Sequence, residues 1–357
     1  MMMTMYGKTK EHMSENAEKN IWVPFGESEM GASHSRREPP YNINQDALQV
    51  YHGEYITVES NGSTKSGMTP TIVAVSDGHG SNKYIRSDIG SKHAVKVINN
   101  EAIKLLQSKS YFSPAMRSDD LQASVAHIKA RFLMWWQEAV KGYHKKQPFS
   151  ENELAFLKQN CSQKDYDSVV NNPVVAYGCT FLAAIAYPDV LVILQYGDGD
   201  VLGLYENGKV WELIEPDPQN FGNQTLSLCT LSDSSKIQHR VLVKRVLDEE
   251  ERTLGEDSKI SVKDEMPMLI TLSTDGIKNS FDDSGEAENG FYKIPRDLKT
   301  LLERNNFNTK DVKGVLKNEL KRITTNGSGD DVTLGVLFNK ASIKDKESKS
   351  NYAQPQH

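Results

Sequence analysis

A short apolar run that ends in a carboxylate is the feature that most constrains this sequence. Residues 71–76 have the composition of a buried strand, and Asp77-Gly78-His79-Gly80 follows directly. Alone, this segment could be a tight turn, because Asp-Gly is a common turn dipeptide. However, further aspartates stand beside other strand-like segments, at Asp46, Asp198, Asp275 and Asp330. Because Mg²⁺ and Mn²⁺ prefer oxygen ligands, carboxylates at several strand ends indicate a hard-cation site.

The strand-like segments follow one another instead of alternating with helices. Four of them come in succession after Gly178, at 180–186, 190–195, 201–205 and 209–213. Asn207-Gly208 is a strong hairpin signal between the last two. This grouping predicts an α+β fold with largely antiparallel sheets. A doubly wound dinucleotide-binding fold would need regular strand–helix alternation and a glycine fingerprint, and the sequence has neither.

Other segments give clear expectations as well. Apolar residues at spacings of three and four predict a long helix over about 119–144 and a shorter helical pattern over 85–98. Residues 45–57 and 71–76 predict two strands joined by the polar loop 61–67, and 147–173 predicts a loop or a short-helix insertion. A late helix capped by Asn308 or Thr309 precedes a final strand at 332–338.

Composition narrows the class of protein. The 357 residues are 38% apolar and 25% charged, which is typical of a globular protein with a sizeable core. A net charge of −6 gives no general attraction to nucleic acid or to anionic membranes, so neither is expected as a partner. We expect a flexible leader at 1–20, one catalytic domain at 21–340 and a charged flexible tail at 341–357. An apolar-poor leader and an odd number of cysteines, three, favour a reducing cytoplasm.

Several segments together carry a resemblance to a known family. They are Asn44–Ala47, Val75–Gly80, Gly178–Thr180, Tyr196–Asp200, Leu272–Gly276 and Gly329–Thr333. In this order they resemble the motifs of the metal-dependent serine/threonine protein phosphatases of type 2C, over about Gly31 to Asn339. The pair Ser33-His34, followed by Asn-Gln-Asp, is similar to a divergent bacterial-style branch of that family.

The resemblance implies a sandwich of two antiparallel β-sheets flanked by helices, with two Mn²⁺ or Mg²⁺ ions at one edge. By position, Asp77 would bridge the ions, the Gly78 carbonyl would complete one shell, and Asp275 and Asp330 would be terminal ligands. Asp46 would act directly or through water. The implied reaction is attack of a metal-bridging hydroxide on a phosphoserine or phosphothreonine, with Asp77 and His79 as catalytic residues. His79 is implied as the general acid, because a serine alkoxide is a poor leaving group.

The sequence also departs from the family pattern. Asp198 matches an aspartate that can hold a third metal together with Asp275, but Gly199-Asp200 and Asn279 differ from the usual residues there. The family's phosphate-binding arginine is missing from positions 41 and 42. Arg36 or Arg37 could replace it, since an arginine fork suits a phosphate dianion, or both could be solvated loop residues. Gln45 replaces an acidic residue near the metals.

Three functions stay open on the sequence. The first is a protein phosphatase, with a phosphorylated protein as substrate and an antagonist serine/threonine kinase as a possible partner. The second is a pseudophosphatase that acts as a regulatory binding module, and the third is a phosphatase for small metabolites. The retained aspartates favour an enzyme, because a module without catalysis has no physical reason to keep mutually repelling carboxylates together.

Overall fold

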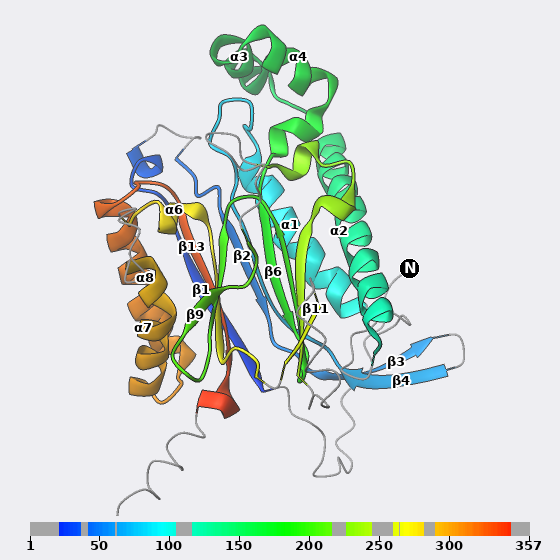
Figure 1. Cartoon of the computed structure of the whole chain (residues 1–357). Coiled ribbons are helices and arrows are strands. Elements are labelled where there is room, and N and C mark those ends of the chain that lie inside the picture. The colour runs from blue at the N-terminus through cyan, green and yellow to red at the C-terminus, as the bar shows by residue number, and fades with distance from the viewer. Residues whose placement is uncertain are drawn as a thin grey trace, which may run out of the picture.

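Two β-sheets packed face to face, with helices on both outer faces, form the body of the protein (Figure 1). The computed structural model describes residues 21–36, 42–60, 63–104, 116–215, 226–244, 260–263, 265–281 and 290–343. The predicted leader at 1–20 lies outside the described residues, as does the predicted tail from 344 onward. The predicted α+β sandwich is confirmed.

The first sheet has the strand order β1-β13-β12-β8-β9, and all of its neighbouring strands are antiparallel. Its strands are β1 (Trp22–Glu29), β8 (Asp200–Leu204), β9 (Val210–Glu212), β12 (Leu269–Ser273) and β13 (Val332–Asn339). The predicted hairpin between β8 and β9 is confirmed, and Gly208 adopts a φ of 81° there. β1 was not predicted, because Pro24, Gly26 and three acidic or hydroxyl residues obscure its alternation.

The second sheet has the order β11-β10-β7-β6-β5-β2. Its strands are β2 (Ala47–Tyr51), β5 (Thr71–Ser76), β6 (Phe181–Ala186), β7 (Val190–Tyr196), β10 (Gln238–Lys244) and β11 (Ile260–Lys263). One pair departs from the prediction of antiparallel sheets, because β10 and β11 run parallel at the edge. The predicted polar loop was also wrong, since residues 63–68 form strand β4 (Ser63–Met68), paired with β3 (Tyr55–Ser60) in a separate hairpin.

The sandwich core follows from the two-residue period of the strands. In β5, Val73 and Val75 face the other sheet, whereas Ile72 and Ala74 face the helices. Every residue of β5, β6, β7, β12 and β13 is buried. These strands are therefore apolar on both faces, which explains why they read as short continuous apolar runs in the sequence.

Two pairs of helices cover the outer faces. On the second sheet lie α1 (Ser87–Lys104) and α2 (Ser118–Lys146), and on the first lie α7 (Gly290–Arg304) and α8 (Thr309–Asn326). The stacked rings of Phe132 and Phe181, 4.0 Å apart, join α2 to β6. The predicted long helix and the Asn308 cap are confirmed, since the Asn308 side chain accepts a hydrogen bond from the Lys310 amide.

Residues 150–171 form a small helical insertion that lies beyond one end of the sandwich (Figure 1). It consists of α3 (Glu151–Asn160) and α4 (Gln163–Asn171). Ser150 and Glu153 form a capping box at the start of α3, which fixes where that helix begins. The sequence prediction of a loop or a short-helix insertion is thus resolved as two capped helices.

The remaining elements are short. They are α6 (Asp275–Lys278) and the 3₁₀ helices η1 (His34–Arg36), η3 (Pro173–Tyr177), η4 (Leu228–Thr230) and η5 (Ser234–Lys236). Ile343 packs into the core beneath α7 and α8, three residues past the predicted domain boundary at 340. Within the described ranges, no helix combines the length and apolar character that crossing a bilayer requires.

Candidate metal centre

The aspartates singled out in the sequence lie where strands end, at one edge of the sandwich. Asp46 stands directly before β2, and Asp77 stands directly after β5. Asp275 begins α6, Asp198 lies in the turn between β7 and β8, and Asp330 lies two residues before β13. These segments are far apart in the sequence, and the pairing of both sheets brings their ends together.

A pocket of about 480 Å³ opens at this edge. Its wall includes four of the predicted aspartates, two histidines and the Gly78 backbone: Asp77, Asp198, Asp275, Asp330, His34, His79 and Gly78. Asp46 is buried behind that wall, with 5% of its surface exposed. The structure therefore brings all the predicted ligand residues into one region. Asp46 lies behind the others and does not line the pocket.

The backbone of Asp77 is held by the Gly178-Cys179-Thr180 segment. The Asp77 amide donates to Thr180 Oγ1 at 3.0 Å, and the Thr180 amide donates to the Asp77 carbonyl at 2.8 Å. Gly78 forms a β-bridge with Cys179, and the His79 amide donates to the Gly178 carbonyl. A Cβ at Gly78 would lie 2.5 Å from the Gln45 carbonyl oxygen, so only glycine fits. This segment thus fixes the predicted ligand and the predicted acid together.

Asp46 is fixed by two hydroxyl groups. Its Oδ2 accepts hydrogen bonds from Thr274 Oγ1 at 2.9 Å and Thr333 Oγ1 at 2.8 Å. Its Oδ1 is buried and has no hydrogen-bond partner among the described residues. A carboxylate oxygen without a partner is costly in a protein interior, so Oδ1 is suited to a cation that the structure does not contain.

Asp275 and Asp330 come together because two backbone segments touch. A Cβ at Gly276 would lie 2.2 Å from the Asp331 carbonyl oxygen, which only a glycine permits. Gly329 adopts a φ of 75°, a conformation that favours glycine, and turns the chain toward β13. Asn279 Nδ2 donates to Asp275 Oδ2 at 3.0 Å, so this departure from the family pattern orients the neighbouring carboxylate.

The electrostatics of the pocket disfavour the charged carboxylates. Burial, followed by the charge of Asp331, raises the pKa of Asp46 well above its ordinary value. Burial and the charges of Asp46, Asp275 and Asp330 raise the pKa of Asp77 in the same direction. Burial and then Asp198 raise the pKa of Asp275 to about 6. A divalent cation would relieve this repulsion, which is the electrostatic signature expected of a metal-binding pocket.

His79 lies on the pocket wall beside Tyr84, with the ring centroids 4.9 Å apart. Its Nε2 is buried and has no hydrogen-bond partner among the described residues. Burial, with a smaller contribution from Lys83, lowers the pKa of His79 to about 4. The imidazole is therefore neutral near pH 7 in the pocket without substrate.

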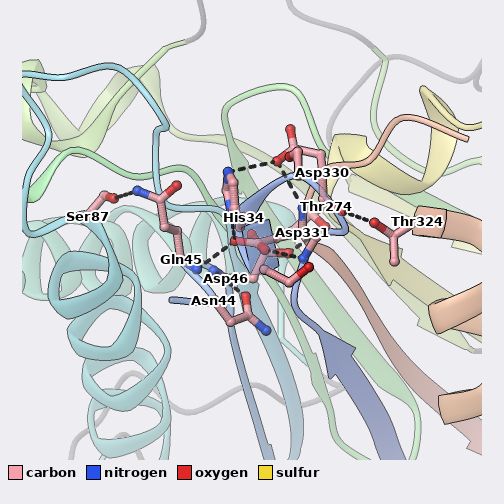
Figure 2. A network of polar contacts seen from close by, with 12 residues as sticks. His34, Asn44, Gln45, Asp46, Ser87, Thr274, Thr324, Asp330 and Asp331 are labelled. Carbon is pink, nitrogen blue, oxygen red and sulfur yellow. Dashed lines mark hydrogen bonds and ion pairs between the residues drawn. The ribbon is translucent and has the colours of Figure 1, made fainter. Parts of the chain in front are cut away.

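A polar network behind the pocket involves residues whose roles were not predicted (Figure 2). Asp331 accepts hydrogen bonds from the amides of Gly31 at 2.6 Å and Gln45 at 2.7 Å. His34 Nδ1 lies 2.9 Å from Asp331 Oδ2, as an electrostatic contact rather than a well-aligned hydrogen bond. The Gln45 side chain donates to Ser87 Oγ at 2.8 Å. The Ser33-His34 pair and the second aspartate of Asp330-Asp331 were the sequence signals for this network.

An ion pair between a buried aspartate and a half-buried lysine lies next to Asp198. Lys278 Nζ lies 2.7 Å from Asp200 Oδ1, and burial raises the pKa of Asp200 to about 6. Asp200 is thus a carboxylate at the start of β8 that is neutralised by a lysine of α6. Asp198, in contrast, faces the pocket. The sequence identified the unusual Gly199-Asp200 pair but not its lysine partner.

The structure describes only one of the two arginines predicted as phosphate-binding candidates. Arg36 is exposed at the end of η1, and the pocket wall includes His34 and Ser33 of that segment but not Arg36. Arg37 lies outside the described residues. The assignment of a phosphate-binding arginine stays a prediction.

In the described ranges, no group of three or more histidine, cysteine, aspartate or glutamate side chains is arranged so that it could hold a metal ion as it stands. The residues nevertheless fit divalent cations. The partnerless Asp46 oxygen and the raised pKa values of three neighbouring aspartates indicate a cluster that lacks positive charge. The donors are mainly carboxylate oxygens, which suit Mg²⁺ and Mn²⁺.

The fold and the pocket define an α+β sandwich protein with an acidic pocket at one edge. The sequence profile of the protein phosphatase 2C family matches residues 30–321, and the chain belongs to that family. The family predicted from the sequence motifs is therefore confirmed. No curated protein sequence matches this chain significantly.

Three solved structures illustrate what the chain is similar to, each at 13% identity. A bacterial serine phosphatase covers 90% of this chain and 98% of its own, with a TM-score of 0.43. PppA, a regulatory component of the Pseudomonas aeruginosa T6SS, covers 89% and 97%, with a TM-score of 0.44. The Mycobacterium tuberculosis serine/threonine phosphatase PstP/Ppp covers 89% and 98%, with a TM-score of 0.42.

Proposed function

We propose that this protein is a Mn²⁺- or Mg²⁺-dependent phosphatase that hydrolyses phosphoserine and phosphothreonine in proteins. The observation that carries the proposal is the pocket in which Asp77, Asp275 and Asp330 converge, with Asp46 behind them, in a member of the protein phosphatase 2C family. We further propose that its substrate is a phosphorylated protein, that a serine/threonine kinase opposes it and that it acts in the cytoplasm.

Asp77, Asp275, Asp330, Asp46 and the Gly78 carbonyl would hold two metal ions, and Asp198 would help to hold a third. When bound, such ions would supply a nucleophile from water at neutral pH and positive charge beside the phosphoryl oxygens. The protein's own residues would orient these ligands. The Thr180 clamp on the Asp77 backbone and the Thr274 and Thr333 hydroxyls on Asp46 prevent the carboxylates from moving apart.

His79 would donate a proton to the leaving serine or threonine oxygen. Its Nε2 has no partner to compete with a substrate, but its pKa is lowered to about 4. A phosphate dianion beside the ring would raise that pKa, because an opposite charge favours the imidazolium. Ser33, Ser328 and Asn279 also line the pocket and offer hydroxyl and amide donors to phosphoryl oxygens.

Phosphate release from a phosphothreonine peptide tests the proposal. The protein is stripped of metal, and Mn²⁺ or Mg²⁺ is then added back. We expect metal-dependent turnover that is lost in Asp77→Asn and Asp275→Ala but kept in Asp297→Asn, a change of an exposed aspartate on α7. Near-normal turnover by Asp77→Asn would contradict the bridging role of Asp77.

The same assay separates the competing functions. Tight metal binding by calorimetry without turnover of any phosphopeptide would identify a pseudophosphatase. Turnover of free phosphoserine with a kcat/KM equal to that for the peptide would identify a phosphatase for small metabolites.

A further inference from the structure

His34 is a nitrogen donor in a pocket whose other predicted ligands are oxygens. It lies on η1, is 4% exposed and lines the pocket beside Asp330. Its Nε2 is 3.7 Å from Asp330 Oδ1, and its Nδ1 is 2.9 Å from Asp331 Oδ2. The ring therefore lies between two carboxylates of consecutive residues, one exposed at the pocket and one buried (Figure 2).

Asp331 fixes the orientation of this ring. It is 3% exposed and is itself held by the amides of Gly31 and Gln45, so it cannot turn away from His34. Asp331 Oδ2 lies beside Nδ1, as a carboxylate does in the carboxylate–histidine pairs that support metal sites. Nε2 is therefore the ring nitrogen on the side of Asp330 and the pocket.

Nε2 and the Asp330 carboxylate oxygen are 3.7 Å apart, and a cation between them would be bound by both. That separation suits two ligands of one ion, because two donors at about 2.1 Å from a metal can be at most about 4.2 Å apart. Asp46 Oδ1, the buried oxygen without a partner, is a second sign that a cation is needed in the same cluster.

We propose that His34 Nε2 coordinates a divalent metal together with Asp330, and that this nitrogen makes the site prefer Mn²⁺ to Mg²⁺. The inference rests on the metal centre of the proposed function and adds a ligand to it. Mg²⁺ favours an all-oxygen shell, whereas imidazole suits transition metals, so one histidine ligand shifts the balance between the two ions. In the alternative, His34 only supports the Asp330-Asp331 segment.

Pulsed EPR of the Mn²⁺-loaded full-length protein distinguishes these roles. With ¹⁵N-labelled histidine, we expect hyperfine coupling from a directly bound nitrogen in the wild type. His34→Asn should lose that coupling, because it keeps an amide near the position of Nδ1 but has no atom at Nε2. His93→Asn, on helix α1 and away from the pocket wall, should retain it.

The inference is overturned if the wild type shows no nitrogen coupling, or if the coupling persists in His34→Asn. Persistence would assign the nitrogen to His79, the other histidine on the pocket wall.

Calorimetry on metal-stripped protein gives an independent test. We expect His34→Asn to weaken Mn²⁺ binding by about 10- to 100-fold, which is typical for disturbed metal-ligand sets, and Mg²⁺ binding by less than about threefold. His34→Gln, which offers an oxygen near Nε2, should bind both ions with a smaller preference than the wild type. It also serves as the variant if His34→Asn does not fold, as judged by circular dichroism.

Equal losses for both ions in His34→Asn or His34→Gln would overturn the inference in favour of a purely structural role. Failure of the proposed function would give a different result from failure of this inference. If a nitrogen binds Mn²⁺ but no phosphopeptide is hydrolysed, the proposed function fails and this inference holds.

Discussion

At the scale of single residues, the pocket holds several carboxylates close together although burial and neighbouring negative charges disfavour their charged forms. Burial, followed by the charge of Asp46, raises the pKa of Asp77, and burial, followed by the charge of Asp198, raises the pKa of Asp275. The hydrogen bonds to Asp46 and the clamp on Asp77 hold these groups in place without neutralising them. This arrangement is typical of a site that selection keeps for chemistry rather than for stability.

His79 gives the first prediction at this scale. His79→Ala should lower turnover of a phosphothreonine peptide by about 10²- to 10⁴-fold, because the alkoxide leaving group needs a proton. Turnover of an aryl phosphate should fall by less than about tenfold, since a phenolate leaves without protonation. The measurement is kcat for both substrates in the variant and the wild type. Equal losses on both substrates would remove His79 as the general acid.

The Asp200–Lys278 pair gives a second prediction, with a pH dependence. The pKa of Asp200 is about 6, above the ordinary value of 3.8, so its contribution to folding stability falls as pH rises from about 4 to 6. Lys278 limits that loss. We expect Lys278→Met to lower the free energy of unfolding by about 2 kcal/mol at pH 8, because the carboxylate is then buried and unpaired. At pH 5, where Asp200 is largely protonated, the cost should be smaller.

Urea unfolding of metal-stripped protein at pH 5 and pH 8 measures this difference. Asp200→Asn combined with Lys278→Met should recover most of the lost stability, since no buried charge remains. A Lys278→Met cost that is the same at both pH values would contradict the pairing as the cause.

At the scale of elements, one arginine ties the helical insertion to the edge of the sandwich that contains the pocket. Arg86 donates to both carboxylate oxygens of Glu153, to the carbonyls of Gln147 and Pro148, and to the Tyr177 hydroxyl. Lys83 makes a second link, with Asp165 of α4 at 3.1 Å. Because Arg86 and Lys83 follow His79 closely in the chain, the insertion and the pocket rim are coupled through one short segment.

Arg86→Met should release this insertion. We expect a loss of about 3 kcal/mol in unfolding free energy, because Glu153 loses its cationic partner and keeps only its contacts with Ser150. Amide hydrogen exchange over residues 150–171 should become at least about tenfold faster. Arg322→Met is a matched control, since its pair with Glu319 is exposed and its loss should leave the free energy of unfolding nearly unchanged. Unchanged exchange over the insertion would show that Arg86 does not anchor it.

At the scale of the whole molecule, the two sheets approach closely where β13 crosses β5. A Cβ at Gly335 would lie 2.4 Å from Val73 Cγ1 and 3.1 Å from Val75 Cγ2. The absence of a side chain at Gly335 lets β13 and β5 pack directly. Asp330 and Asp77 stand near the ends of these strands, so the sheet spacing also sets how far apart the two carboxylates lie.

Gly335→Ala should therefore lower the free energy of unfolding by about 1–3 kcal/mol through overpacking. Val73→Ala alone should also destabilise, because it leaves a cavity. The double variant should be more stable than the sum of the two losses predicts, by at least about 0.5 kcal/mol, since the new methyl group fills the space that Val73 leaves. Urea unfolding of the four proteins completes the cycle, and strict additivity would contradict direct packing at this position.

The sequence alone determined the family, the sandwich and the set of pocket aspartates. The strands that line the core are short apolar runs, and each pocket aspartate stands at or beside the end of one, so local pattern was sufficient. Local pattern failed where polar residues form strands, as in β1 and β4, because cross-strand pairing rather than side-chain alternation stabilises them.

Only the tertiary structure placed Asp46 behind the pocket, joined Asp200 to Lys278 and set His34 between Asp330 and Asp331. These contacts join residues 78 or more positions apart, and no local periodicity encodes such a distance. The charges of the site were visible in the sequence. Their mutual repulsion, and the buried partners that hold them together, follow from how the two sheets pack.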